Sequence, residues 1–106
     1  MPWTLRHYED NRGAHPVGEF LQSLTKSDRA VVKAKLFYLQ ERGNQLREPF
    51  TKSLGDGLFE LRVQAYRILF CFRSGNRIVL LHAFRKKSRT TPRRDLDLAR
   101  KRLQEV

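Results

Sequence analysis

The chain has 106 residues, of which 40% are hydrophobic, and its formal net charge is +11 at pH 7. This length and apolar content suffice for one domain, residues 1–106, so neither disulfide bonds nor a structural metal is required for folding. The single cysteine, Cys71, has no partner within the chain, and no apolar run approaches the ~18 residues that span a bilayer. The N-terminus also lacks a signal-like segment, so we expect a cytoplasmic protein that does not enter membranes.

The positive charge is concentrated in the second half of the chain. Residues 1–50 carry a net charge of +2, whereas residues 51–106 carry +9. The densest stretch, Arg85–Arg94, has six basic residues and no acidic one. Such a one-sided basic field is typical of a protein that binds a polyanion, although it could also serve only to keep a surface solvated.

The first elements in chain order are a predicted strand and a predicted helix. Residues Trp3–Tyr8 alternate weakly between apolar and polar side chains, and a turn signal follows at Asp10–Gly13. Pro16 suits the first turn of a helix, and apolar residues then recur at the spacing of one helical face. These residues are Val17, Phe20, Leu21 and Leu24.

A second helix is predicted directly after the first. Thr25 and Asp28 have the spacing of a capping box, and the segment Arg29–Arg42 continues the helical pattern. Gly43 and the asparagine after it are a normal C-terminal stop. The first fifty residues therefore predict a strand and a helical hairpin.

The second half changes to strand periodicity. Residues Leu58–Phe72 predict two strands joined by a short turn at Gln64-Ala65, and Arg77–Lys87 predicts a third strand entered through Ser74–Asn76. Thr91-Pro92 can start a last helix with an apolar stripe of Leu96, Ala99 and Leu103. The order of elements predicts an α+β domain: an antiparallel sheet of about four strands, the helical hairpin on one face, and a C-terminal helix.

The predicted turns fix which residues face each other across the strands. A turn at Gln64-Ala65 places Arg62 opposite Arg67, and a two-residue turn at Gly75-Asn76 places Phe84 opposite Arg67. Like charges directly opposite each other destabilise a sheet. We therefore expect an anion to lie between the two arginines, and guanidinium groups suit phosphate oxygens well.

The same register divides the predicted sheet into two faces. The face that should pack on the helical hairpin comprises Phe59, Leu61, Val63, Tyr66, Ile68, Phe70, Phe72, Val79 and Leu81. On the other face, the last helix could cover one end, formed by Leu58, Leu69, Cys71, Ile78 and Leu80. The remaining end has no predicted apolar cover and comprises Glu60, Arg62, Arg67, His82, Phe84 and Lys86. This open end is the predicted functional surface.

Several residues of this surface have structural alternatives. Glu60 could simply form an ion pair with an arginine, and Phe84 could be ordinary core beneath the last helix instead of a platform for an unstacked base. His82 could be a half-buried sheet histidine or a proton carrier. The other histidines, His7 and His15, form no metal-ligand spacing with it, so no metal site and no cofactor are predicted.

The motifs of the second half resemble those of the RelE/HigB superfamily of toxin–antitoxin toxins, nearest to its phage-derived, HigB-like branch. The motifs are Lys52 with Leu54, Glu60-Leu61-Arg62, Tyr66-Arg67, Phe84 with Lys86-Lys87, and Thr91-Pro92. The resemblance implies a small microbial ribonuclease fold and metal-independent cleavage of messenger RNA, usually in the ribosomal decoding site. It also implies an antitoxin partner, often one with a helix-turn-helix domain.

The resemblance also implies roles for individual residues. Arg62 and Arg67 match basic residues that bind or polarise the scissile phosphate. The region of Arg85, Lys86 and Lys87 holds a further catalytic or substrate-holding base, and Lys52 lies near a region that supplies lysines. We expect catalytic roles for Arg62, Arg67, Lys86 and His82. We expect substrate binding by Lys52, Glu60, Phe84, Arg85, Lys87 and Arg89.

The proton carrier and the activity itself remain open at this point. Several family members have a Tyr or His after the last strand or near the C-terminus, and residues 88–106 contain neither. Glu60, His82 and Lys86 are the available candidates for proton transfer during attack of the RNA 2′-hydroxyl on the adjacent phosphate. The alternatives to a ribonuclease are a non-catalytic basic module that binds RNA or DNA, and a degenerate toxin that only binds its antitoxin.

Overall fold

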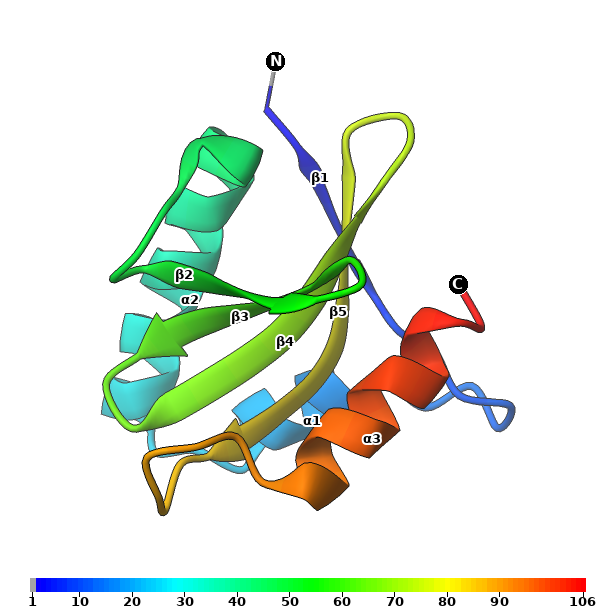
Figure 1. Ribbon diagram of the computed structural model, residues 1–106. Helices are drawn as coiled ribbons and strands as arrows, with labels where there is room; N and C mark the ends of the chain where they lie inside the picture. Colours follow the sequence, from blue (N-terminus) through cyan, green and yellow to red (C-terminus); the bar gives the residue numbers. More distant parts are fainter. Residues whose placement is uncertain (1) are drawn as a thin grey trace.

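The computed structural model describes residues 2–106 as a five-stranded sheet with helices on both of its faces (Figure 1). The strand order is β1-β5-β4-β3-β2; β1 runs parallel to β5, and the other neighbours are antiparallel. The elements in chain order are β1 (Thr4–His7), α1 (Pro16–Gln22), α2 (Lys26–Arg42), the short 3₁₀ helix η1 (Gly43–Gln45), β2 (Thr51–Gly55), β3 (Leu58–Val63), β4 (Tyr66–Arg73), β5 (Arg77–Arg85) and α3 (Arg93–Leu103).

The sheet differs from the predicted one in two details. It has an additional edge strand, β2, which pairs with β3. The residues of β2 are mostly exposed and polar, so they carry no apolar alternation that would have indicated a strand. In addition, the sheet is mixed instead of antiparallel, because β1 pairs in parallel with β5, from Thr4 opposite Arg77 to His7 opposite Leu80. None of the helices in residues 2–106 is long and apolar enough to cross a membrane.

The predicted helix boundaries are confirmed by their local contacts. Thr25 caps α2, since its hydroxyl accepts a hydrogen bond of 3.1 Å from the Asp28 backbone N–H. The Asp28 carboxylate does not complete a capping box; it accepts a 2.6 Å hydrogen bond from the Tyr66 hydroxyl and so ties the helix to the sheet. Gly43 ends α2 with a φ of +52°, and the Trp3 indole occupies the space where a Cβ would lie.

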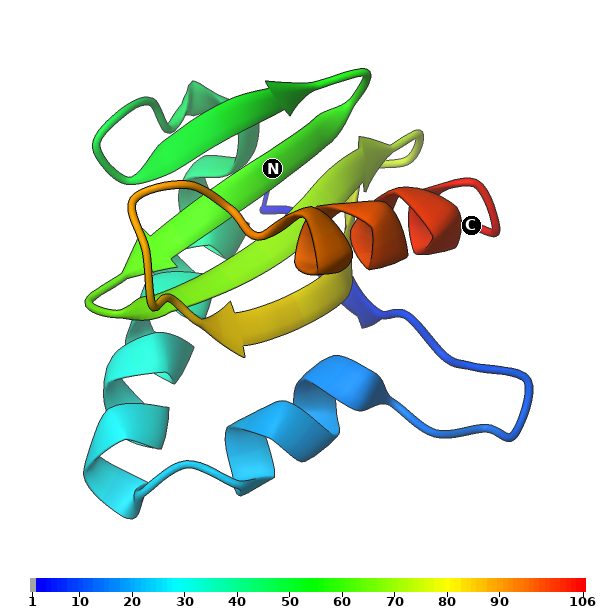
Figure 2. The same ribbon diagram turned by 60° about the horizontal axis from the view of Figure 1, so that its bottom comes forward.

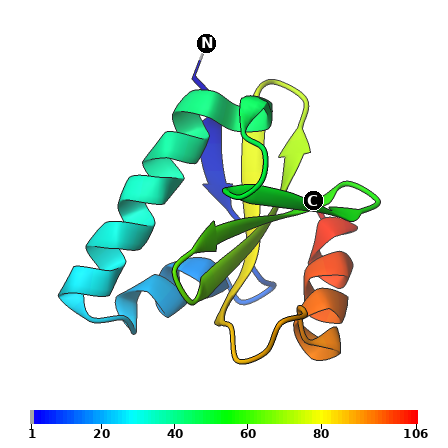
Figure 3. The same ribbon diagram turned by 60° about the vertical axis from the view of Figure 1, so that its left-hand side comes forward.

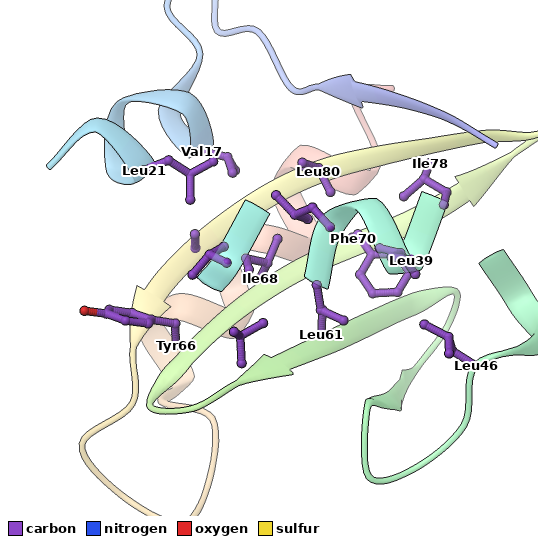
Figure 4. Packing of buried hydrophobic residues seen from close by; sticks show 14 residues of the cluster. Val17, Leu21, Leu39, Leu46, Leu61, Tyr66, Ile68, Phe70, Ile78 and Leu80 are labelled. Atoms are coloured by element: carbon purple, nitrogen blue, oxygen red, sulfur yellow. The ribbon is translucent and has the colours of Figure 1, made fainter. Parts of the chain in front are cut away.

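Two apolar clusters lie on opposite faces of the sheet. Figure 3 shows α2 and α3 on opposite sides of the strands. The larger cluster, beneath α1 and α2, packs Phe70 and Ile68 of β4 against Leu39 of α2 and its neighbours (Figure 4). The smaller cluster, beneath α3, packs Leu58, Leu69, Cys71 and other strand residues against Ala99. We call these the hairpin face and the α3 face.

The pairing of β4 with β5 contains an irregularity that the sequence did not predict. Arg73 pairs with Arg77, so the turn has three residues instead of two, and a β-bulge follows between Leu69 and Phe70. Phe70 therefore pairs with Leu80, and Leu81 is the extra residue of the bulge. The pairing of Phe70 with Leu81 that the predicted two-residue turn implies is wrong. The predicted faces of four β5 residues are consequently also wrong. Ile78 and Leu80 belong to the hairpin face, and Val79 and Leu81 belong to the α3 face.

Arginine side chains fasten α3 to the strands it crosses. Arg102 donates a 2.8 Å hydrogen bond to the backbone carbonyl of Leu81, and Arg100 donates one of 2.8 Å to the carbonyl of Leu54. At the far end, Arg73 of β4 donates to the carbonyl of Leu103 at 2.9 Å. The helix therefore has a fixed position over one end of the α3 face, and the β5–α3 connection passes beside it over the other end (Figure 2).

Candidate functional site

A pocket of about 220 Å³ lies at the open end of the α3 face. Strands β2 to β5 supply its floor, and the β5–α3 connection and the start of α3 supply its rim. Its lining residues are Lys52, Leu54, Glu60, Arg62, Arg67, Phe84, Lys86, Arg89, Thr90, Thr91 and Leu96. We call it the basic pocket, because five of these side chains are lysine or arginine.

The centre of the basic pocket is a buried carboxylate between two arginines. Arg62 lies directly opposite Arg67 across β3 and β4, as the short Gln64-Ala65 turn predicts. The Arg62 Nε lies 3.2 Å, and the Arg67 Nε 3.8 Å, from Oε1 of Glu60, whose residue is 3% exposed. The anion expected between the arginines is thus supplied in part by the protein itself. One carboxylate cannot neutralise two guanidinium groups, so this group of three keeps a net positive charge.

Arg67 is held more firmly than Arg62. Its Nη1 donates hydrogen bonds of 2.8 Å to the backbone carbonyls of both Gln64 and Tyr66, which fix the guanidinium at the β3–β4 turn. Burial lowers the pKa of Arg67 from its ordinary value, the Glu60 carboxylate opposes this effect, and Arg62 adds to it. Arg62 is more accessible, with 31% of its side chain exposed. A rigid donor therefore lies beside a more adaptable one.

Thr91 links the rim of the basic pocket to its floor. Its hydroxyl donates a 2.8 Å hydrogen bond to Oε2 of Glu60, whereas the contacts with the two arginines involve Oε1. Glu60 therefore has partners on both oxygens. The ion pair with an arginine, which the sequence analysis gave as the structural alternative for Glu60, is present in the structure. Thr91 was missed by the site analysis of the sequence, where it appeared only as a helix-start signal, because nothing local relates it to a residue 31 positions earlier.

Three further cations stand around this centre. Lys52 comes from β2, Lys86 follows the end of β5, and Arg89 lies in the connection to α3; all three line the pocket. Within residues 2–106 none of them takes part in an ion pair. Their charges are therefore free to attract an anion into the pocket.

Phe84 and His82 lie next to each other but in different surroundings. Phe84 lines the basic pocket opposite Arg67, and it is also 8% exposed and part of the α3-face cluster. The His82 ring stacks on Phe84 with centroids 5.8 Å apart, and its Nε2 lies 2.6 Å from Oδ1 of Asp95 in α3. His82 does not line the pocket. The structure thus places it at the contact between β5 and α3.

Arg85 and Lys87, which were predicted to bind substrate, also lie outside the pocket. Arg85 lies across the sheet from Tyr66, and its guanidinium carbon stands 5.7 Å from the centroid of the Tyr66 ring, which belongs to the hairpin-face cluster. Lys87 is exposed in the β5–α3 connection and does not line the pocket. The structure therefore gathers Lys52, Glu60, Arg62, Arg67, Phe84, Lys86 and Arg89, and it separates His82, Arg85 and Lys87 from them.

The geometry suits an oxyanion better than a metal. The fixed guanidinium of Arg67 and the more adaptable one of Arg62 line a solvent-accessible hollow, and such donors can stabilise charge that develops on a phosphate. Among residues 2–106, no three His, Cys, Asp or Glu side chains are grouped so that they could hold a metal ion. The pocket is therefore chemically suited to a phosphodiester held by arginine and lysine.

Two solved structures are similar to this chain over most of its length. One is the RelBE2 toxin–antitoxin complex of Mycobacterium tuberculosis, with a TM-score of 0.63 and 20% identity, over 83% of this chain and 95% of that chain. The other is the archaeal RelE–RelB complex of Pyrococcus horikoshii OT3, with a TM-score of 0.62 and 23% identity, over 85% of this chain and 100% of that chain. The predicted fold class, an α+β fold like that of RelE, is confirmed.

A sequence comparison covers nearly the same region. Residues 19–104 match the family model described as "Phage derived protein Gp49-like (DUF891)". The matched segment extends from α1 to the end of α3 and includes every residue that lines the basic pocket. No curated protein matches the chain.

Proposed function

The chain belongs to the Gp49-like family of phage-derived proteins, and from this premise we propose that it is the toxin of a toxin–antitoxin pair and cleaves messenger RNA. The resemblance to the phage-derived branch of the RelE/HigB superfamily that was inferred from the sequence is confirmed. The proposed activity is an endoribonuclease reaction that requires no cofactor. It takes place in the cytoplasm, with message bound in the ribosomal decoding site.

The observation that carries this proposal is the buried Glu60 carboxylate between Arg62 and Arg67 at the floor of an open cationic pocket. Two opposed arginines cost stability, and simple phosphate binding could be met by scattered lysines. Glu60 positions Arg62, and backbone carbonyls fix Arg67. Such preorganised donors stabilise a transition state because they need little rearrangement as charge develops.

The proposed reaction is attack of an RNA 2′-oxygen on the adjacent phosphorus. A bond forms between the 2′-oxygen and phosphorus, and the bond from phosphorus to the 5′-oxygen breaks, which leaves a 2′,3′-cyclic phosphate and a 5′-hydroxyl. Arg67 stabilises the extra negative charge on the non-bridging oxygens, and Arg62 binds the phosphate. Lys52 and Arg89 hold the strand on either side, and Phe84 offers an apolar surface for a displaced base.

Proton transfer to the leaving 5′-oxygen is the proposed role of Lys86. Its side chain lines the basic pocket, whereas His82 lies outside it with one ring nitrogen 2.6 Å from Asp95. The ammonium group gives its proton to the 5′-oxygen, and the proton of the attacking hydroxyl passes to solvent. General acid catalysis of this kind contributes about 100- to 10,000-fold. His82 then acts by holding α3 in place.

The proposed partners are message, the ribosome and an antitoxin. The two similar structures are complexes of RelE with RelB, and we infer by analogy that an antitoxin binds this chain as well. The sequence resemblance favours an antitoxin of the helix-turn-helix type. The basic half of the chain is suited to the phosphate backbones of messenger and ribosomal RNA.

The proposal is tested by brief induced expression of the parent chain and of Arg67→Ala, followed by primer-extension mapping of transcripts. We expect growth arrest and new 5′ ends with the parent, and loss of both with Arg67→Ala, by the roughly 100- to 1,000-fold that one oxyanion donor supplies. Arg77→Ala, which removes an exposed arginine at the other end of β5, is the matched control and should cleave like the parent. Intact messages with the parent would favour a binding module or a degenerate toxin instead.

A further inference from the structure

A second group of aromatic and basic side chains lies between α2 and the start of β2. Tyr38 of α2 and Phe50, just before β2, meet edge to face with ring centroids 5.8 Å apart. The ammonium of Lys35 lies 4.8 Å from the centroid of Phe50, and the guanidinium carbon of Arg42 lies 5.7 Å from that of Tyr38. We call these four residues the Phe50 patch. The basic pocket does not include any of them.

The Phe50 patch is continuous with the basic pocket through the backbone. The carbonyl of Phe50 accepts a 2.9 Å hydrogen bond from the backbone N–H of Arg62, whose side chain is the accessible arginine of the pocket. Lys52, two residues after Phe50, lines the pocket. A nucleic-acid strand that leaves the pocket past Arg62 and Lys52 at this edge of the sheet can therefore reach Phe50.

Exposure and charge distinguish Phe50 from the other aromatic residues. Most phenylalanines of the chain are packed in the core, but Phe50 is 37% exposed and Phe37 is 65% exposed. Only Phe50 of these two has a cation over its ring. Within residues 2–106, neither Lys35 nor Arg42 forms an ion pair, so both charges are available to a phosphate.

We infer that the Phe50 patch binds a base of single-stranded RNA next to the nucleotide whose phosphate lies in the basic pocket. An exposed ring bordered by unpaired cations has the composition of a stacking site, in which the ring contacts the base and the cations contact the backbone. This inference rests on the proposed function, because it takes the strand in the pocket to be RNA. The patch extends the substrate path around the edge of the sheet from the α3 face towards α2.

Binding of a single-stranded 2′-O-methyl RNA, which cannot be cut by 2′-hydroxyl attack, measures the patch separately from cleavage. We expect Phe50→Ala to weaken this binding by about 5- to 150-fold, the range for one stacked base. Binding of inorganic polyphosphate, which has charge but no base, should not change. Phe50→Trp should retain RNA binding, and RNA but not polyphosphate should quench its added fluorescence. Phe37→Ala is the matched control for removal of an exposed ring and should bind both probes like the parent.

Each outcome has a definite meaning. Unchanged RNA binding by Phe50→Ala overturns the inference, and so does an equal loss of polyphosphate binding, since either result shows that the ring contacts no base. Loss of RNA binding in Phe50→Trp as well would show that the substitution disturbs the loop, and it would also overturn the stacking role. If the parent cleaves no message but Phe50 still contributes to RNA binding, the ribonuclease proposal fails and the stacking site stands.

Discussion

The hairpin face of the sheet carries an apolar cluster of fourteen buried residues, whereas the α3 face carries one of eight that gives way to charged side chains. The covering elements differ accordingly. The hairpin face has α2 with 17 residues and α1 with 7, and the α3 face has only the 11 residues of α3. Helix α3 is about 16 Å long, while β5 beneath it extends for about 30 Å, so this helix leaves part of the face uncovered.

The difference indicates that one face of the sheet supplies most of the core and the other supplies the site of the proposed activity. The same strands provide both, because Leu61 and Ile68 point to the hairpin face while their neighbours Arg62 and Arg67 point to the pocket. Alternation along a strand thus connects a rigid core directly to the charged site. Substitutions on the two faces should therefore have separable effects.

The largest expected effect is on the cleavage rate, through a residue of the basic pocket on the α3 face. Lys86→Met should lower the cleavage rate by about 100- to 10,000-fold, because it removes the proposed proton donor and leaves the core intact. His82→Gln should change the rate far less, since His82 lies outside the pocket. Single-turnover cleavage of ribosome-bound message measures both. The opposite order would make His82 the proton carrier, as the sequence also allowed.

A comparably large effect, on stability, is expected from a substitution on the hairpin face. Phe70→Ala should lower the free energy of unfolding by about 3–5 kcal/mol, because a fully buried ring in the middle of the cluster is lost. Leu103→Ala on α3 should cost less, since that side chain is only partly buried. Urea denaturation of both variants measures the difference. Equal losses would contradict the view that the hairpin face dominates stability.

Glu60→Gln tests whether the Glu60 carboxylate contributes to both stability and cleavage. It leaves Arg62 and Arg67 opposed without a carboxylate, and we expect a loss of about 1–3 kcal/mol in unfolding free energy, less than for a fully buried pair because Arg62 is partly exposed. Cleavage should fall as well, since Arg62 loses the carboxylate that positions it. Thr91→Val removes only the hydrogen bond to Oε2 and should cost about 1 kcal/mol. Glu60→Gln with parental stability and activity would show that the carboxylate positions nothing.

The smallest expected effect lies outside both faces, in the β1–α1 loop. The backbone N–H groups of Ala14 and Arg12 donate to Asp10 and hold the pKa of its carboxyl below the ordinary value. A carboxyl with a lowered folded pKa stabilises the protein above its unfolded pKa of about 3.9, and this contribution is lost as the pH falls through the folded pKa. The stability difference between the parent and Asp10→Asn should therefore shrink on acidification. Denaturation at neutral and at acid pH measures it, and a constant difference would contradict the assignment.

The position of the arginine pair could be predicted because it depends on local sequence. Two strands joined by Gln64-Ala65 allow few registers, and the alternation of apolar residues selects the one that places Arg62 opposite Arg67. The helix caps at Thr25 and Gly43 are local for the same reason. Features of this kind can be predicted because they depend on only a few neighbouring residues.

The features that were missed depend on contacts between distant parts of the chain. Strand β2 is polar and has no periodic signal, and the parallel pairing of β1 with β5 joins residues more than seventy positions apart. The role of Glu60 as a partner of both arginines and of Thr91 arises only once three segments meet. The separation of His82 and Arg85 from the pocket likewise depends on the packing of α3 and on the direction of β5 near its end.

The β-bulge at Leu81 bears on how the chain responds to changes in the length of the β4–β5 turn. The three-residue turn at residues 74–76 moves the β4–β5 pairing by one position, and the extra residue in β5 moves it back before Arg67 meets Phe84. The extra residue of the turn is thus offset within β5, and the shift is not transmitted to the charged residues. We therefore expect a one-residue change at the tip of this hairpin to disturb the pairing near the turn more than the alignment of Arg67 with Phe84.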